Sequence, residues 1–378
     1  MDNPQPIPFN RADFGPREDA YALEALRSGK TSGDGPFGKR AEALLAEALG
    51  APRVLLTTSC THALEMTALL LDLEPGDEVI VPSFTFVSTV NAFVLRGARP
   101  VFVDVREDTL NLDEQLLEEA ITDRTRAIYV VHYAGVACDM DRITAIASGR
   151  AIPVIEDNAH GVFASYRGKR LGTFGAAATL SFHETKNYTC GEGGALILND
   201  AAMVERAEII REKGTNRSRF LRGQVDKYTW VDVGSSYILS DVLAGVLLAQ
   251  LERREEIRQR RTAIWERYHA ALWLWARAKG ALLPTVPEEC GQGYHLFYIL
   301  MPTATQRNDA LDSLRAQGIS ATFHYLPLHL SDVGRSYGYI DGDLPVTESV
   351  SERLLRLPFY NGLTEADQCR VIAAVERL

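Results

Sequence analysis

Val54-Leu-Leu56 runs into Thr57-Thr-Ser-Cys-Thr61 and then into an apolar stretch that ends near Leu71. A short apolar strand, a turn of small hydroxyl residues and a helical pattern follow one another here, and the same order begins again at Glu78 and at Pro100. Strands that alternate with helices favour a largely parallel sheet covered on both faces. Ligands of such sheets bind at the carboxyl ends of the strands, so we expect an α/β fold with its site at that edge.

One lysine stands out near this expected edge. Leu180 and Phe182 alternate with polar neighbours like a short buried strand, and Lys186 follows in the stretch Thr179-Leu-Ser-Phe-His-Glu-Thr-Lys-Asn-Tyr-Thr-Cys-Gly-Glu-Gly-Gly194. A loop lysine taken at random is an ordinary solvated one. The hydroxyl, aromatic and glycine neighbours instead favour a desolvated amine, and such lysines form Schiff bases with pyridoxal phosphate. We therefore expect Lys186 to carry this cofactor covalently.

A second stretch, Ile152-Pro-Val-Ile-Glu-Asp-Asn-Ala-His160, supplies an acid and a histidine. Pyridoxal phosphate works as an electron sink while its ring nitrogen stays protonated, and a buried carboxylate facing that nitrogen keeps it so. Asp157 is the candidate, because Glu156 should point to the opposite face of the strand. His160 can hydrogen-bond the ring hydroxyl or the substrate, or it can be a structural histidine at a strand end. The expected catalytic residues are thus Lys186, Asp157 and His160.

The turn from Thr57 to Ala63 has the character of a phosphate cradle. Small hydroxyl residues lie where a helix begins, so unpaired backbone N–H groups and the positive end of the helix dipole can meet a dianion. Ser59 or Thr61 can instead merely cap that helix, and the residues alone favour this alternative. Phe86 is, on the same grounds, a core phenylalanine.

Length and composition bound the class of protein. The 378 residues exceed what one hydrophobic core usually serves, so we expect a large domain over residues 1–250 and a smaller one over residues 251–378. A formal charge of −10 argues against general nucleic-acid binding. We expect no membrane span and no secretory signal, because no apolar run is long enough and the N-terminus lacks a basic start. Five cysteines without metal-ligand spacing indicate reduced thiols, a cytoplasmic location and no metal site.

Three motifs carry a resemblance to a known family. They are Glu156-Asp-Asn-Ala-His160, Ser181-Phe-His-Glu-Thr-Lys-Asn187 and Gly191-Glu-Gly-Gly194. The chain resembles the sugar aminotransferases of the DegT/DnrJ/EryC1/StrS family, from about Ile7 to the C-terminus. This resemblance implies fold type I of the pyridoxal phosphate enzymes, which is aspartate aminotransferase-like. Its large domain has a mixed, mostly parallel sheet, and the smaller C-terminal domain is also α/β.

The resemblance also implies further site residues. Those implied to bind the cofactor phosphate are Ser59, Cys60, Thr61 and Ser181. Phe86 is implied to stack on the pyridine ring. Many members have an asparagine that reaches the cofactor phosphate of the neighbouring subunit where this chain has Ser236, whose reach is shorter. The residues implied to contact the substrate are Lys227, Tyr228, Trp230, His324, Tyr325 and His329.

Residues 131–135, 211–217 and 224–230 point to a narrower group within the family. They imply a homodimer with its active site at the subunit interface. The implied reaction moves an amino group from L-glutamate to the nucleotide sugar dTDP-4-dehydro-6-deoxy-D-glucose, and its product serves lipopolysaccharide, O-antigen or enterobacterial common antigen biosynthesis. A product of the opposite configuration at C4, or a UDP-sugar substrate, remains an alternative.

Three other function classes are weighed against this one. Sugar dehydratases with this fold have histidine in place of the lysine, whereas Lys186 is present here. A nicotinamide oxidoreductase would suit an α/β sheet, but no Gly-x-Gly-x-x-Gly follows the first strand. A non-catalytic regulator that binds the cofactor would need a DNA-binding element, and no basic segment suggests one. The transaminase is therefore the preferred hypothesis.

Overall fold

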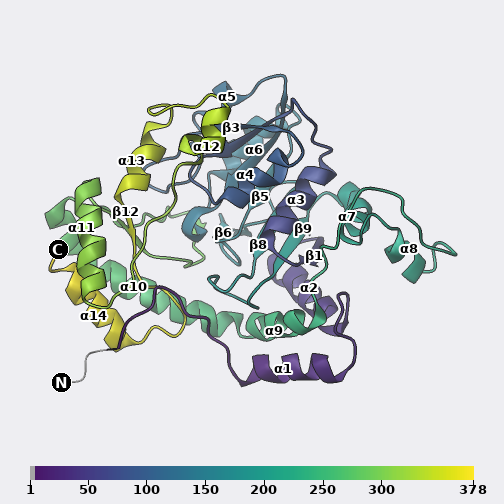
Figure 1. Cartoon of the computed structure of the whole chain (residues 1–378), viewed down its shortest axis with the longest axis horizontal. Helices are drawn as coiled ribbons and strands as arrows, with labels where there is room; N and C mark the ends of the chain where they lie inside the picture. Colours follow the sequence, from purple (N-terminus) through teal and green to yellow (C-terminus); the bar gives the residue numbers. More distant parts are fainter. Residues whose placement is uncertain (1–4) are drawn as a thin grey trace.

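The computed structural model describes residues 5–378 and is built around a seven-stranded sheet (Figure 1). Its strands, in spatial order, are β1 (Arg53–Thr57), β9 (Gly194–Leu198), β8 (Ala177–Ser181), β5 (Val154–Asp157), β4 (Thr125–Val131), β2 (Glu78–Pro82) and β3 (Arg99–Val103). Strands from β8 to β3 pair in parallel, whereas β9 is antiparallel to both of its neighbours. The sheet is therefore mixed and mostly parallel, as the sequence predicts.

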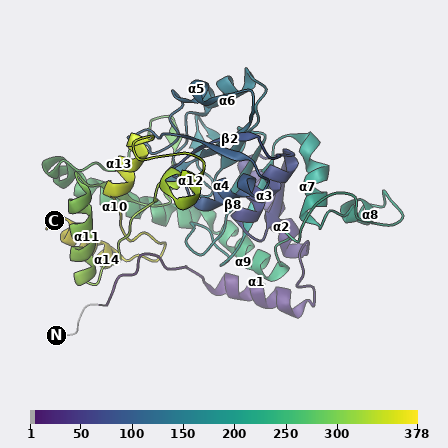
Figure 2. The ribbon, with the colours of Figure 1, turned by 45° about the horizontal axis from the view of Figure 1, so that its top comes forward.

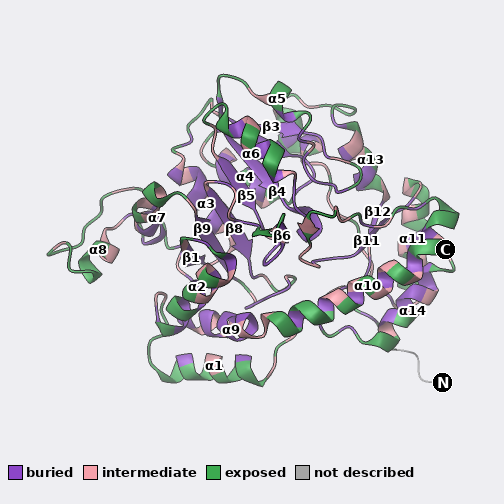
Figure 3. Ribbon diagram, turned by 180° about the vertical axis from the view of Figure 1, so that it is seen from behind, coloured by how far each residue is buried: buried purple, intermediate pink, exposed green. Residues whose placement is uncertain are grey.

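Helices cover both faces of this sheet, which explains why its strands are almost continuously apolar. Leu55 of β1 packs into the core under α3 (Cys60–Leu70) and α4 (Val87–Val94). Its neighbours Val54 and Leu56 point the other way, into the core with α2 (Pro36–Leu49) and α9 (Asp241–Glu252). Seen from behind, the strands lie buried between these layers (Figure 3). The alternation within β1 thus divides one apolar run between two cores.

The remaining elements flank this core. The helices are α1 (Pro16–Arg27), α5 (Leu117–Ala120), α6 (Met140–Ser148), α7 (Val204–Arg211), α8 (Arg217–Leu221) and α12 (Asp332–Ser336). A small second sheet contains β10 (Cys290–Gly291), β6 (Ser165–Tyr166) and β7 (Lys169–Arg170). Three short 3-10 turns cover Tyr133–Gly135, Ala201–Met203 and Leu328–Leu330. Within the described residues, no helix is both long and apolar enough to cross a membrane.

The C-terminal residues form a separate core. It joins α10 (Arg254–Lys279), α11 (Ala304–Ala316), α14 (Glu365–Val375) and the antiparallel pair β11 (Tyr298–Leu300) and β12 (Leu354–Arg356), with α13 (Pro345–Arg353) beside it. The N-terminal segment belongs to this core as well, because Ile7 is buried in it and bridges Ile319. The division at residue 250 stays a prediction, although α9 packs in the sheet core and α10 mainly in this second one.

An arm of residues 212–236, which includes α8, projects from the body of the molecule (Figures 1 and 2). Its surface carries apolar side chains that are 39% to 76% exposed, namely Phe220, Leu221, Tyr228, Trp230, Val231 and Val233. Exposed apolar side chains are thus concentrated on this one projecting segment.

Three sequence patterns indicate more regular elements than the structure contains. The helical pattern near Leu112 to Ile121 forms only α5, because the Asp113 side chain accepts the backbone N–H of Gln115 and so competes with the helix. The sequence of residues 322–325 is typical of a strand, but it forms a single bridge between Thr322 and Arg356. The sequence beyond residue 241 indicates one long helix, whereas the structure has two, α9 and α10, which meet at Arg253.

Candidate active site

The carboxyl ends of the parallel strands open onto a cavity of about 310 Å³. Side chains from the large sheet, from the C-terminal core and from the N-terminal segment all line it. Of the residues expected from the sequence, the structure brings together here Ser59, Cys60, Thr61, Phe86, Asp157, His160, Ser181, Lys186, His324 and Tyr325. The edge predicted to hold a ligand is thus the edge that holds the cavity.

Lys186 lies in the loop that follows β8. The loop is anchored where Phe182 donates its N–H to the carbonyl of Gly193 and accepts the N–H of Cys190. Burial lowers the pKa of Lys186 from 10.5 to about 8, although the nearby thiol of Cys60 and the carboxylate of Asp157 act to raise it. A substantial fraction of the amine is therefore neutral at the pH of a cell, which is the form that attacks a carbonyl carbon.

Asp157 closes the inner side of the cavity at the end of β5. The hydroxyl of Thr89 donates to its Oδ2 at 2.7 Å, and the N–H of Ala159 donates to its Oδ1 at 3.2 Å. Burial raises the pKa of Asp157, against the effect of these hydrogen bonds and of the Lys186 charge. A buried carboxylate in this state gains most from a cation placed opposite it, and the protonated ring nitrogen of pyridoxal phosphate is such a cation.

Glu156, the preceding residue, has a different and purely structural role. Its carboxylate is fully buried on the opposite face of β5, where His132 contacts it at 3.0 Å and the N–H groups of Gly172, Phe174 and Gly175 donate to it. Burial acts to raise the pKa of Glu156, but the hydrogen bonds from His132 and the glycine N–H groups outweigh it and lower the pKa. Alternation along the strand therefore sends only one of the two acids to the cavity.

His160 is a neutral hydrogen-bond donor. The backbone N–H of Ala134 donates to its Nδ1 at 3.3 Å, so we assign the ring proton to Nε2, which lies 3.4 Å from the hydroxyl of Tyr325. Burial, with the charges of Lys186 and Arg356, keeps the pKa of His160 well below 6.5. Its ring stacks on His295 at a centroid distance of 4.1 Å, which fixes its plane in the cavity wall.

The turn before α3 can hold a phosphate and also caps its helix. Ser59 is the N-cap residue, and its Oγ accepts the N–H of His62 at 3.1 Å. Thr61 Oγ1 lies 2.8 Å from Ser88 Oγ, and both residues line the cavity. A Cβ added to Gly194 would lie 2.3 Å from the Ser59 carbonyl carbon, so only glycine lets β9 approach this turn so closely. The residues present therefore fit pyridoxal phosphate, with Asp157 suited to its ring nitrogen and the turn before α3 suited to its phosphate.

Phe86 and Cys60 differ from each other in exposure. The ring of Phe86 is 57% exposed within the described chain although it lines the cavity, so its face is available for stacking on an aromatic ligand. Cys60 lies deeper, and burial, together with the negative charge of Asp157, raises the pKa of its thiol. Cys60 is thus a neutral wall of the cavity rather than an anion near the phosphate.

Five of the expected site residues do not reach this cavity. Lys227, Tyr228, Trp230 and Ser236 lie exposed on the projecting arm. His329 is fully buried and is held between Ser83 at 2.8 Å and Glu348 at 3.1 Å, so its ring is part of the packing beside β3 and does not face the cavity. His324, in the same sequence stretch, does line the cavity and lies 3.0 Å from the hydroxyl of Tyr133.

Several residues that line the cavity were not predicted from the sequence, and three of them come from distant parts of the chain. Phe9 arrives from the N-terminal segment, His295 precedes β11, and Arg356 ends β12. For Arg356 a signal was present, because it is the lone charge in the apolar run Leu354-Leu-Arg-Leu-Pro358. Phe9 and His295 have no comparable local signal.

Comparisons with known proteins agree with this geometry. The relative MJ1066 of Methanocaldococcus jannaschii, an uncharacterized protein, is 34% identical over 379 residues, covering 98% of this chain and 97% of its own. The aminotransferase TlmJ from Streptoalloteichus hindustanus is 34% identical, with a TM-score of 0.90 and 98% of each chain covered. Spr1654 from Streptococcus pneumoniae, solved in a PLP-form, is 27% identical, with a TM-score of 0.91 and 98% of each chain covered.

The family match extends over residues 13–376, which is nearly the whole chain. It agrees with the three motifs around Asp157, Lys186 and Gly194 and with the fold of the solved relatives. The protein accordingly belongs to the DegT/DnrJ/EryC1/StrS aminotransferase family and is a transferase that depends on pyridoxal phosphate.

Proposed function

We propose that the protein transfers the amino group of L-glutamate to dTDP-4-dehydro-6-deoxy-D-glucose, giving dTDP-4-amino-4,6-dideoxy-D-galactose and 2-oxoglutarate. It would then be a dTDP-4-amino-4,6-dideoxygalactose transaminase. Support for a sugar acceptor comes from the family and from Spr1654, which is described as a proposed sugar aminotransferase. Support for this particular sugar comes from the sequence runs at residues 131–135, 211–217 and 224–230.

One observation carries the transferase chemistry: the amine of Lys186, with its pKa lowered to about 8, shares a cavity with the buried carboxylate of Asp157. When bound, pyridoxal phosphate supplies an electron sink for the electron pair left behind as the donor loses its Cα proton. Asp157 would keep the ring nitrogen protonated, and Ser59, Thr61 and Ser181 would hold the phosphate near the N-terminus of α3.

Lys186 also moves the proton. Its Nζ removes the Cα proton of glutamate in the first half of the reaction, and returns a proton to C4 of the sugar in the second half. His160 directs its Nε2 proton toward the hydroxyl oxygen of Tyr325, 3.4 Å away, and the two side chains form a polar wall of the cavity. The buried setting excludes water, which would otherwise compete with the substrate for these groups.

The exposed arm supports a homodimer in this proposal. In a dimer, the arm of one subunit would cover its apolar side chains and bring Ser236, Lys227, Tyr228 and Trp230 to the cavity of its partner. Ser236 would then donate to the cofactor phosphate, and the aromatic residues would contact the nucleotide. Mixing subunits altered at Lys186 with subunits altered at Ser236 tests this: recovered activity in the hybrids is expected, and its absence counts against a shared site.

Incubation of the enzyme with glutamate and a panel of dTDP- and UDP-linked keto sugars tests the substrate. We expect amination of dTDP-4-dehydro-6-deoxy-D-glucose, with the amine axial at C4 in the NMR spectrum of the product. An equatorial amine would identify the 4-amino-4,6-dideoxyglucose product instead. Turnover of a UDP-sugar alone would change the nucleotide. The cytoplasmic location and the downstream pathway stay predictions.

A further inference from the structure

Two nearly inaccessible arginines show where this chain places a guanidinium that has little contact with water. Arg261, which is 2% exposed, donates to the carbonyls of Tyr294 and His295 and to Asn361. Arg211, which is 4% exposed, forms ion pairs with Asp34 and Glu42. Both charges are therefore accounted for by partners on the protein.

Arg356 is different. Its guanidinium makes no hydrogen bond and no ion pair with any residue between 5 and 378, and its buried Nε has no partner there. Burial lowers the pKa of this guanidinium, and only the hydroxyls of Tyr133 and Tyr325 act in the opposite direction. Arg356 is half-buried in the cavity wall, and a cation in such a place without a counterion is unfavourable, so a folded chain keeps one mainly where a ligand supplies the anion.

The surroundings hold this guanidinium in one plane. Its Cζ lies 4.7 Å from the centroid of the Phe9 ring. Phe9 is fixed in turn, because its carbonyl accepts the N–H of Phe359 at 3.2 Å and Ile7 bridges Ile319. A guanidinium stacked on an aromatic ring presents its edge, and the edge is what binds a carboxylate through two parallel N–H donors.

The other basic side chains that line the cavity are committed or uncharged, and His183 among them already lies 3.6 Å from the carboxylate of Glu192. Lys186 is the expected covalent anchor. Burial lowers the pKa values of His160, His295 and His324 well below 6.5, so these rings are neutral at neutral pH. Among the described residues that line the cavity, Arg356 is the one arginine.

We propose that Arg356 binds the α-carboxylate of the amino donor, with Phe9 as the residue that positions its guanidinium. This inference rests on the proposed function, because it names the anion that accompanies the amino group. The α-carboxylate is attached to the reacting carbon, so it must lie in the same cavity as Lys186. The reacting ring of the sugar is uncharged. The sugar nucleotide's pyrophosphate is attached at C1, across the sugar ring from C4, so it lies farther from the reacting carbon than the α-carboxylate does.

The test uses the loaded enzyme and three donors. L-Glutamate carries both carboxylates, L-isoglutamine lacks the charge of the α-carboxylate, and L-glutamine lacks that of the γ-carboxylate. The rate constant over Kd of the first half-reaction is measured by rapid mixing with each donor. For the unaltered enzyme, glutamate should exceed isoglutamine by about 10- to 100-fold, the range of a charge-assisted hydrogen-bonded pair.

Arg356→Gln should abolish this preference. We expect it to slow the reaction with glutamate and glutamine by the same factor while leaving isoglutamine nearly unchanged, and Arg356→Lys should recover part of the loss. Equal losses for all three donors would show a structural role and overturn the proposal. Loss of the preference for glutamate over glutamine instead would assign Arg356 to the γ-carboxylate and would also overturn it.

Two controls separate possible failures. Arg353, on the same segment, pairs with Glu107 at 2.9 Å outside the cavity, so Arg353→Gln should leave all three donors unaffected. Borohydride treatment followed by peptide mapping reads cofactor attachment without turnover. An unlabelled Lys186 would contradict the proposed function itself. A labelled Lys186, together with an unchanged donor preference in Arg356→Gln, would contradict only the role proposed for Arg356.

Discussion

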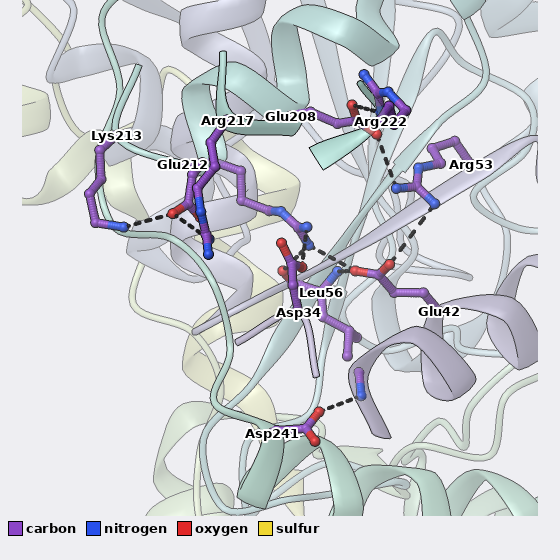
Figure 4. A network of polar contacts seen from close by, with 12 residues as sticks. Asp34, Glu42, Arg53, Leu56, Glu208, Glu212, Lys213, Arg217, Arg222 and Asp241 are labelled. Carbon is purple, nitrogen blue, oxygen red and sulfur yellow. Dashed lines mark hydrogen bonds and ion pairs between the residues drawn. The ribbon is translucent and has the colours of Figure 1, made fainter. Parts of the chain in front are cut away.

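The largest charged network and the active-site cavity differ in whether their charged side chains have partners within the protein. Beside α2 and α7, Arg211 lies between Glu42 and Asp34, and Glu208 lies between Arg53 and Arg222 (Figure 4). This network borders a cavity of about 610 Å³, roughly twice the volume of the cavity at Lys186. The larger hollow, however, is the one whose buried charges already have partners on the protein.

In the smaller cavity at Lys186, two charged groups lack such partners within residues 5–378. Asp157 accepts hydrogen bonds from neutral donors, and the Arg356 guanidinium donates none. Charged groups that are paired within the protein have a structural role, whereas unpaired charged groups need a cofactor or substrate to supply the opposite charge. The pairing of charges therefore distinguishes the candidate active site from the larger cavity beside Arg211, whereas cavity volume alone would favour the larger one.

Among the variants that test this difference, Lys186→Ala should have the largest effect. It removes the expected anchor and proton carrier, so turnover should fall by about 10⁴-fold or more. The thermal midpoint of the cofactor-free protein should change little, because the amine has been desolvated without a compensating partner. Steady-state assay and calorimetry on the same preparation measure the two effects. Substantial remaining turnover would contradict the assignment.

A matched pair of arginine variants comes next. Arg211→Met leaves Glu42 and Asp34 without their shared cation and should lower the free energy of unfolding by about 3–5 kcal/mol. Arg356→Met leaves no carboxylate behind and removes an unpaired cation, so its free energy of unfolding should stay the same or rise rather than fall. Urea titration of the cofactor-free proteins measures both. Equal losses would remove the distinction between the two regions.

The protonation of Lys186 sharpens the contrast further. In the cofactor-free protein the folded state releases this proton near pH 8, whereas the unfolded chain keeps it to about 10.5. Between these values the unfolded state binds more protons, so stability rises with pH. Relative to Lys186→Met, the unaltered protein should gain about 2–3 kcal/mol from pH 8 to pH 10.5. Parallel pH profiles of the two proteins would refute the lowered pKa.

The smallest expected effect on stability comes from removing a solvent-exposed ion pair. Arg315 and Asp312 lie 3.0 Å apart on α11, and each side chain is 76% exposed. Arg315→Ala should change the free energy of unfolding by less than about 0.5 kcal/mol, because solvent screens the pair. It calibrates the other measurements, since a larger loss here would indicate effects beyond the loss of a charge partner.

The features that could be predicted from the sequence are those encoded by short stretches of residues. The alternating strands and helices predicted the sheet, and the family, enzyme class and cofactor expected from the motifs are confirmed. Lys186 and Asp157 stand next to strands of this sheet, so their meeting at one edge followed from topology. Their roles stay predictions, as does the identity of the sugar.

The rest depends on contacts that no short stretch of sequence contains. His324 and His329 are five residues apart in one motif, yet a turn of the backbone sends one to the cavity and the other into packing with Ser83. Arg356 and Phe9 come from opposite ends of the chain. In the proposed dimer, the surroundings of the arm residues, including Trp230, would depend on a second subunit. Each of these cases is decided by tertiary or quaternary arrangement.

The adjacent acids of β5 have a consequence for what this strand can tolerate. Glu156 ties down the loop of residues 172–175, and Asp157 serves the cavity, on opposite faces of one strand. Inserting or deleting one residue between 152 and 155 would exchange the two faces, so a single frame slip would loosen the loop and misplace the acid together. We expect natural length variation in this enzyme to avoid that short segment altogether.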